Sequence, residues 1–144
     1  MYDEIERMPY GKRSNYPHMK PADIAVWERF IEQNPNAYDE VAYDVVVGEG
    51  AAIPTGTEEI IAKDFKQLTQ RKIDVVGFHT GAIDVIEVKP TVGFSAMGQA
   101  AGGKHLYIET YNPDIEPQAV VIAGAPGSDM ETPAAAMGIK IIIV

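Results

Sequence analysis

Three charged residues, Asp74, Glu87 and Lys89, have the types and spacing of a site that binds a metal ion and acts on a phosphate ester. Each lies in an apolar stretch rich in β-branched residues, Asp74 in residues 72–79 and the other two in residues 82–89. This composition predicts two β-strands. The chemistry therefore depends on how the two strands place the three side chains.

The dipeptide Thr80-Gly81 stands between these strands and predicts a tight β-hairpin. In a hairpin symmetric about this turn, Asp74 lies directly opposite Glu87. Lys89 shares their face because side chains alternate along a strand, and Asp84 points to the other face. Directly opposed carboxylates have Cβ atoms about 4.5–5.5 Å apart and repel each other, so the pair requires a cation between its members.

The ligand types indicate which cation this is. Oxygen ligands with open coordination positions suit Mg²⁺ or Mn²⁺ better than Zn²⁺. The chain contains no cysteine, which excludes thiolate metal sites and disulfides. Lys89 beside such a cation could orient a water molecule and stabilise charge in a phosphoryl transition state. The alternative is that both carboxylates are solvated, or that they form an ion pair with Lys89.

The rest of the chain predicts one α/β domain over residues 22–144, behind an N-terminal arm over residues 1–21. Helices and strands alternate along the domain, which predicts a mixed sheet with helices on both faces, and the last two strands are expected to be parallel. The further predicted elements are a helix over 21–34, a strand over Val41–Val47, a helix over Thr57–Gln70, a helix over Phe94–Tyr111, a strand over Gln118–Ala123, a helix over Ser128–Met137 and a strand over Ile139–Val144.

Three patterns within these elements give more specific expectations. Alternation from Val41 to Val47 places Val41, Tyr43, Val45 and Val47 on one side of their strand. Gly98, Gly102 and Gly103 interrupt a helix at a cost of about 1 kcal/mol each, and close packing on the sheet is the expected reason. The arm is rich in Pro and Tyr and slightly basic, so it is either a tail that follows the surface or an arm that binds a partner or nucleic acid.

The chain from residue 22 to residue 124 resembles the PD-(D/E)xK nuclease superfamily, through Asp74 on one strand and Glu87-Val88-Lys89 at the end of the next. The resemblance implies a restriction-endonuclease-like αβββαβ core, here with a C-terminal αβ extension. It implies that Asp74 and Glu87 bind Mg²⁺ or Mn²⁺, with the Val88 carbonyl as a further ligand. It also implies that Lys89 positions and activates the attacking water.

Two further matches follow from the same resemblance. Gln99, with Tyr107 eight residues later, matches a pair found in the following helix of many members and implies a site role for Gln99. Glu28 is the best fit to an acidic residue of the first helix that adds to the metal site in some members. Ile73 stands where the proline of the family name is expected.

Charge limits the partners that the chain can bind. The 12 Lys and Arg residues against 21 Asp and Glu give a net charge of −9, which excludes non-specific wrapping of DNA. Arg71 and Lys72 form a local basic edge near the acid pair, either as a phosphate contact or as a solvated strand end. No apolar run reaches the roughly 18 residues of a membrane span, so no membrane partner is expected.

The predicted function is that of a Mg²⁺-dependent endo- or exodeoxyribonuclease with DNA as its substrate. The alternative is a catalytically weak or inactive nuclease-fold protein that serves as a structural or adaptor component of a larger assembly, such as a phage particle. This alternative implies a homo-oligomer or phage assembly partners. The expected location is cytoplasmic, or virion-associated if the protein is phage-encoded.

Overall fold

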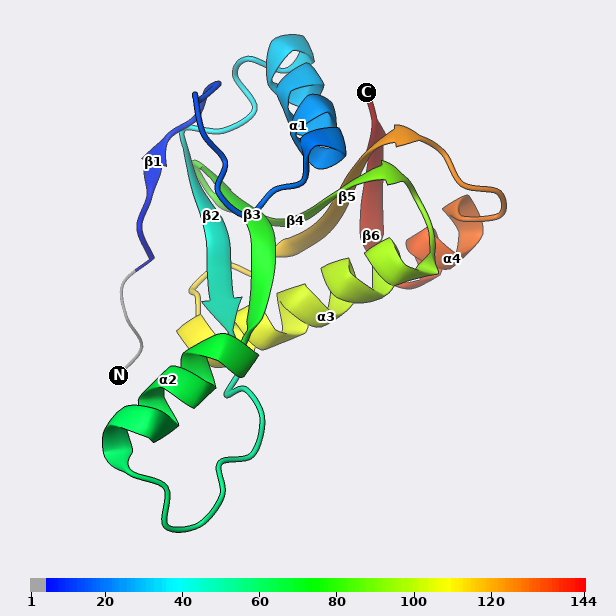
Figure 1. Ribbon diagram of the computed structural model, residues 1–144. Helices are drawn as coiled ribbons and strands as arrows, with labels where there is room; N and C mark the ends of the chain where they lie inside the picture. The colour runs from blue at the N-terminus through cyan, green and yellow to red at the C-terminus, as the bar shows by residue number, and fades with distance from the viewer. Residues whose placement is uncertain (1–4) are drawn as a thin grey trace.

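A six-stranded mixed sheet forms the centre of the protein, with helices on both faces (Figure 1). The computed structural model describes residues 5–144. The strands lie side by side in chain order, antiparallel from β1 to β4 and parallel from β4 to β6. They are β1 Met8–Pro9, β2 Glu40–Val47, β3 Arg71–His79, β4 Ala82–Thr91, β5 Gln118–Ala125 and β6 Ile139–Ile143.

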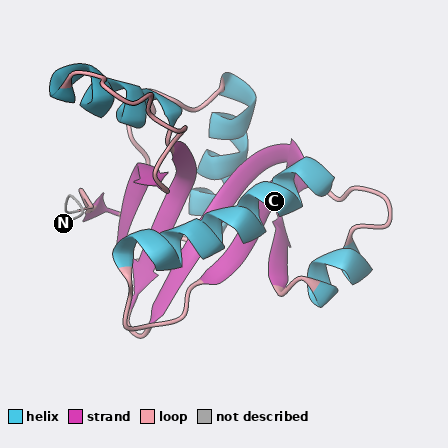
Figure 2. Cartoon of the chain, turned by 90° about the horizontal axis from the view of Figure 1, so that it is seen from below, coloured by secondary structure: helices cyan, strands magenta, loops and turns pink. Residues whose placement is uncertain are grey.

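The helices are α1 Pro21–Gln33, α2 Glu59–Thr69, α3 Phe94–Tyr111 and α4 Glu131–Ala136. Helix α1 covers one face of the sheet and α3 crosses the other, as Figures 1 and 2 show from two directions. The order α1, β2, β3, β4, α3, β5 is the expected αβββαβ order, with α2 inserted between β2 and β3 and with α4 and β6 added at the end. The predicted fold class and the parallel final strands are confirmed. None of the helices within residues 5–144 has the length and apolarity needed to cross a membrane.

The core on the α1 face is built around Trp27, which is fully buried. Its ring stacks on Phe30 with centroids 5.4 Å apart, and its Nε1 donates a hydrogen bond to the Tyr43 hydroxyl at 2.9 Å. The segment before α1 joins this core, because Tyr16 is buried in it and the Tyr10 hydroxyl donates a hydrogen bond to a main-chain carbonyl at the end of α1. Tyr10 and Tyr16 of the expected arm are therefore core contacts of the domain, and Tyr2 lies outside the described residues.

Strand β2 changes face in its middle. Tyr43 belongs to the core on the α1 face, whereas Val45 and Val47 belong to the core on the α3 face. Between them Asp44 has a φ of 51°, in the left-handed region, which shifts the alternation of the strand by one position. The prediction that Val41, Tyr43, Val45 and Val47 share one side is thus wrong beyond Tyr43.

Of the three glycines in α3, only Gly103 packs closely on the sheet as predicted. A Cβ on Gly103 would lie 3.4 Å from the Ile73 side chain, so this glycine packs closely on the sheet. A Cβ on Gly98 or Gly102 would meet nothing within 4 Å. The expectation of close packing is therefore wrong for these two, which lie on a side of α3 that does not contact the sheet.

Helix α2 projects away from the rest of the molecule (Figures 1 and 2). None of its described residues is buried, and its apolar residues Ile60, Ile61 and Leu68 are 77%, 55% and 84% exposed. Its attachment is polar: the Thr69 hydroxyl accepts a hydrogen bond from the Ala51 N–H, and the side-chain amide of Gln70 donates one to the Gly48 carbonyl. The predicted helix exists, but it does not contribute to the core.

Candidate active site

The candidate site forms where β3 and β4 separate. The predicted register holds along the hairpin, with Val76 opposite Val85 and Gly77 opposite Asp84, and the last paired residues are Val75 and Ile86. Beyond them the ladder ends, so the N–H of Val88 has no partner on β3 in the regular pattern. The carboxylate of Asp74 accepts this N–H at 3.0 Å instead.

Asp74 therefore reaches the site through a distortion of its strand. Residues 44 and 74 are skipped in the β2–β3 pairing, which continues with Val45 opposite Ile73. Ile73 lies in the α3-face core, whereas Val75 lies in the α1-face core, so the strand changes face at Asp74. Asp74 and Glu87 are therefore not an ordinary cross-strand pair as predicted, because the paired register ends at Val75 and Ile86. Their carboxyl groups nevertheless interact, and each acts on the pKa of the other.

Glu87 is the most deeply buried acidic side chain of the site, with 5% of the residue exposed. The Lys89 Nζ lies 3.3 Å from its Oε1, and the lysine side chain is 32% exposed. The pair is therefore open to solvent at Lys89 and enclosed by protein at Glu87. Asp74, Glu87 and Lys89 thus form one compact cluster, which we call the acid–lysine cluster.

Burial and mutual repulsion shift the pKa values of the cluster. Burial raises the pKa of Glu87 to about 8, with the negative charge of Asp74 as the next cause, and Lys89 opposes both. Burial also raises the pKa of Asp74, opposed by the Val88 N–H and by Lys89. Burial lowers the pKa of Lys89, but the charges of Glu87 and Asp74 outweigh this effect and raise it overall. Two carboxylates crowded in this way favour the entry of a cation.

The raised pKa of Glu87 predicts a loss of stability with rising pH in EDTA. The unfolded chain releases this proton near the ordinary glutamate value of 4.5, whereas the folded chain holds it to about pH 8. Between these values the folded state binds more protons, so the free energy of unfolding falls by at most about 1.4 kcal/mol per pH unit. Glu87→Gln is expected to flatten this dependence and to be more stable than the wild type at pH 8.

Thermal unfolding at several pH values between 4.5 and 8 measures this effect. Glu40→Gln, which changes an exposed carboxylate on β2, is the matched control and should follow the wild type. Parallel curves for the wild type and Glu87→Gln would contradict the pKa assigned to the buried carboxyl group.

A groove of about 620 Å³ runs along α3 beside the cluster. Glu87 lines it from the sheet, and Gln99 lines it from the helix, where its side-chain amide donates a hydrogen bond to the Ser95 hydroxyl at 3.1 Å. Arg71 and Lys72 of the predicted basic edge line the same groove as Glu87. The groove also includes Gly98 and Gly102, the glycines that have no packing role in the fold.

Two residues matched by the resemblance lie outside the cluster. Tyr107 is buried in the α3-face core, where its ring contacts Tyr111 at a centroid distance of 5.1 Å. Glu28 accepts a hydrogen bond from the Tyr16 hydroxyl at 3.2 Å. The role of Glu28 in a metal site stays a prediction.

Asp23 is the acidic residue of α1 that acts on the cluster. Its negative charge contributes to the raised pKa values of both Asp74 and Lys89. The wheel of α1 favours Glu28 because it borders the apolar stripe, but a wheel gives only the face of a helix and not the height along its axis. Asp23 lies in the first turn, at the end of α1 that is near the cluster.

The donor set of the cluster fits a divalent cation that keeps ligands from solvent or substrate. Within residues 5–144 no group of three or more His, Cys, Asp or Glu side chains could enclose a metal ion. The two carboxylates leave other coordination positions open, as is usual for Mg²⁺ bound with substrate phosphates. The hydrogen bond from Val88 to Asp74 holds the Val88 peptide group against the same pair.

Comparison with known proteins identifies no family for this chain. No protein-family model and no curated protein sequence matches it. Among solved structures, it is similar to EndoMS in a complex with double-stranded DNA, with 17% identity, a TM-score of 0.49, and coverage of 92% of this chain and 49% of the EndoMS chain. It is also similar to AF1548, a protein of unknown function, with 15% identity, a TM-score of 0.41, and coverage of 83% and 54%. The chain thus spans about half the length of each matched chain, and similarity at this level does not establish a shared function.

Proposed function

We propose that this protein is a nuclease that hydrolyses DNA phosphodiester bonds with a bound divalent cation, Mg²⁺ or Mn²⁺. The observation that carries the proposal is the acid–lysine cluster, formed where β3 and β4 separate. The groove beside the cluster has basic side chains on its wall. A phosphate ester is anionic, so the basic groove wall can bind it. It also reacts through an anionic transition state, which a cation held by the cluster can stabilise.

Asp74 and Glu87 would hold the cation, with the Val88 carbonyl as a third donor. When bound, the cation supplies charge neutralisation and polarises the scissile phosphate as a Lewis acid. The protein contributes the fixed positions of the two carboxylates: one is held by the Val88 N–H and the other by burial beneath Lys89. This preorganisation limits the side-chain entropy that is lost when the site is loaded.

Lys89 is proposed to orient the attacking water. An ammonium group has three N–H donors, and the contact with Glu87 engages one of them. The remaining donors can hold a water molecule and stabilise charge on the phosphate in the transition state. Gln99 is proposed to help place the substrate, and Arg71 and Lys72 to contact its phosphates from the groove wall.

Cleavage assays with controlled metal content test the proposal. The purified protein is expected to cleave plasmid, linear duplex or single-stranded DNA with Mg²⁺ or Mn²⁺, and EDTA should stop the reaction. Asp74→Asn should lower the rate about tenfold or more, because a charge that holds the cation is lost. Asp84→Asn is the matched control, since Asp84 lies on the other face of the hairpin, where its carboxylate accepts a hydrogen bond from the Tyr38 hydroxyl.

The same assay addresses the alternative function. A nuclease-fold protein that serves as a structural or adaptor component of a larger assembly would cleave none of these DNA forms with either cation. Its mass in solution would then indicate a ring or another homo-oligomer. Metal-dependent cleavage by a monomer would count against this alternative.

A further inference from the structure

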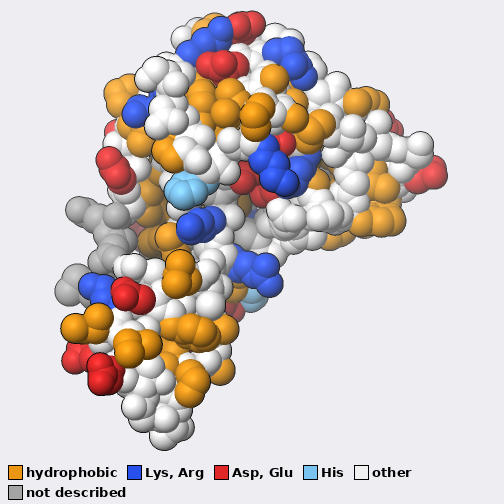
Figure 3. All heavy atoms as spheres, viewed as in Figure 1, with side chains coloured by type: hydrophobic (Ala, Val, Ile, Leu, Met, Phe, Trp, Pro, Cys, Tyr) orange, Lys and Arg blue, Asp and Glu red, His pale blue; other side chains and the backbone are white. Residues whose placement is uncertain are grey.

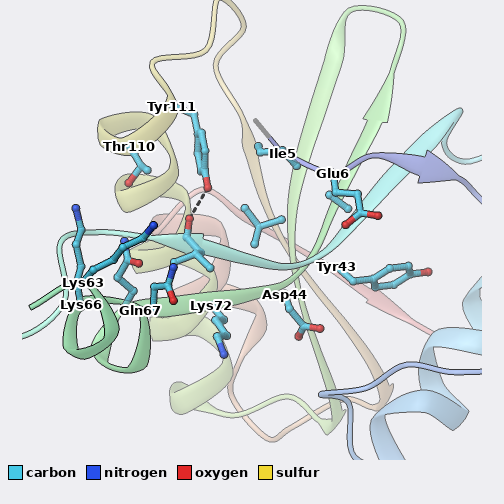
Figure 4. A pocket seen from close by; sticks show the side chains of 14 residues that line it. Ile5, Glu6, Tyr43, Asp44, Lys63, Lys66, Gln67, Lys72, Thr110 and Tyr111 are labelled. Atoms are coloured by element: carbon cyan, nitrogen blue, oxygen red, sulfur yellow. Dashed lines mark hydrogen bonds between the residues drawn. The ribbon is translucent and has the colours of Figure 1, made fainter. Parts of the chain in front are cut away.

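A second hollow, of about 570 Å³, lies between α2 and the sheet (Figure 4). This hollow and the groove share Gln70 and Lys72 in their walls. Figure 4 shows Lys63, Lys66 and Gln67 on α2 at one side of the hollow. The two hollows therefore adjoin at Gln70 and Lys72.

The α2 side of the hollow is positively charged on a chain of net charge −9. Lys63, Lys66 and Lys72 line it, and within residues 5–144 none of the three forms an ion pair with a carboxylate. By contrast, Lys12, Lys89 and Lys104 are each paired with a glutamate. Lys63 and Lys66 therefore have no carboxylate partner among residues 5–144, whereas the charge of Lys72 already acts on Asp44, where it opposes the rise of the pKa that burial causes.

The two acidic residues of the hollow oppose this charge only in part. Glu6 and Asp44 line it from the N-terminal segment and from β2, on the side away from α2 in Figure 4. Lys63 and Lys66 are three residues apart, and positions at this spacing share one face of a helix. Figure 3 shows separate Lys and Arg side chains at the junction between the α2 lobe and the body, and others elsewhere on the same face.

We propose that this hollow, the lysine pocket, binds phosphates of the DNA backbone at positions beyond the one that is cleaved. The path runs from Glu87 in the groove across Lys72 to Lys63 and Lys66 on α2. The proposal rests on the proposed function in placing the cleaved phosphate at the acid–lysine cluster. Contacts of this kind hold DNA independently of its base sequence, because every nucleotide presents the same phosphate.

The salt dependence of DNA binding tests the proposal without cleavage. Binding of a fluorescent duplex is measured by anisotropy in EDTA at several KCl concentrations, for the wild type and for Lys63→Gln/Lys66→Gln. Removing one lysine that neutralises a phosphate is expected to reduce the slope of log K against log salt by about 0.9, so the double variant should show a slope reduced by about 1.8. The reduction should be the same for two unrelated sequences.

The controls separate this result from other causes. Lys20→Gln/Lys140→Gln removes two exposed lysines that line neither hollow and should leave the slope unchanged. If the double variant on α2 melts at a lower temperature, each single variant should still reduce the slope by about 0.9. An unchanged slope, or a wild type that binds no DNA, would overturn the lysine pocket. A reduced slope in a protein that cleaves no DNA would overturn the proposed function and leave the pocket standing.

Discussion

Replacing Lys89 with alanine is expected to slow metal-dependent DNA cleavage by about 10²–10³-fold, the usual effect of removing one preorganised donor that stabilises a transition state. This effect is expected from the position of Lys89. Lys89 is the cationic side chain that contacts the buried Glu87, at 3.3 Å, and it remains partly exposed to a substrate. Single-turnover rates at saturating DNA and saturating Mg²⁺ measure the effect on the chemical step.

Two readouts distinguish this role from a structural one. The affinity of Lys89→Ala for Mn²⁺ should be equal to that of the wild type or higher, because the ammonium group no longer competes with the cation for Glu87. Lys140→Ala, which changes an exposed lysine on β6, should cleave at the wild-type rate. Equal rates for Lys89→Ala and the wild type would remove Lys89 from the mechanism.

Trp27→Ala is expected to lower the free energy of unfolding by about 3–5 kcal/mol. Trp27 has no exposed surface, stacks on Phe30 and makes edge contacts with Tyr10 and Tyr43. The truncation would open a cavity between α1, the N-terminal segment and β2. Urea denaturation followed by far-UV circular dichroism measures the loss, since Trp27 is the only tryptophan and the variant has no tryptophan fluorescence to follow.

A smaller substitution keeps this prediction testable if the alanine variant does not fold. Trp27→Phe removes the hydrogen bond to the Tyr43 hydroxyl and part of the ring, and should cost about 1–2 kcal/mol. A decrease below about 1 kcal/mol for Trp27→Ala would mean that the site collapses around the smaller side chain.

Local patterns are sufficient to predict the order of the elements and the register of the hairpin. The apolar periods of α1, β3, β4 and β5 are strong, and the turn at Thr80-Gly81 fixes which residues oppose each other. Glu87, Gln99 and the basic edge line one groove, whose position depends on the course of α3 as well as on that register. Asp74 accepts the Val88 N–H beyond the end of the paired register.

The errors have causes that a sequence pattern does not contain. The change of face at Asp44 depends on a left-handed backbone angle at a residue that also occurs in regular strands. The charge effect of Asp23 on Asp74, which the wheel of α1 does not indicate, depends on the axial position of α1 on the sheet, and this position is set by tertiary packing. The close packing that was expected at Gly98 and Gly102 is absent. The sequence does not reveal this, because a glycine in a helix looks the same in the sequence whether it faces the sheet or open space.

The projection of α2 has a consequence for how this protein can change. A segment with no buried side chain can be lengthened, shortened or given new charges with little effect on the free energy of unfolding, because the entropy of loop closure grows slowly with length. The acid–lysine cluster, in contrast, depends on the point at which two core strands part. Substrate retention and bond cleavage would thus be carried by parts of the molecule that can evolve independently, one with wide tolerance to substitution and one with almost none.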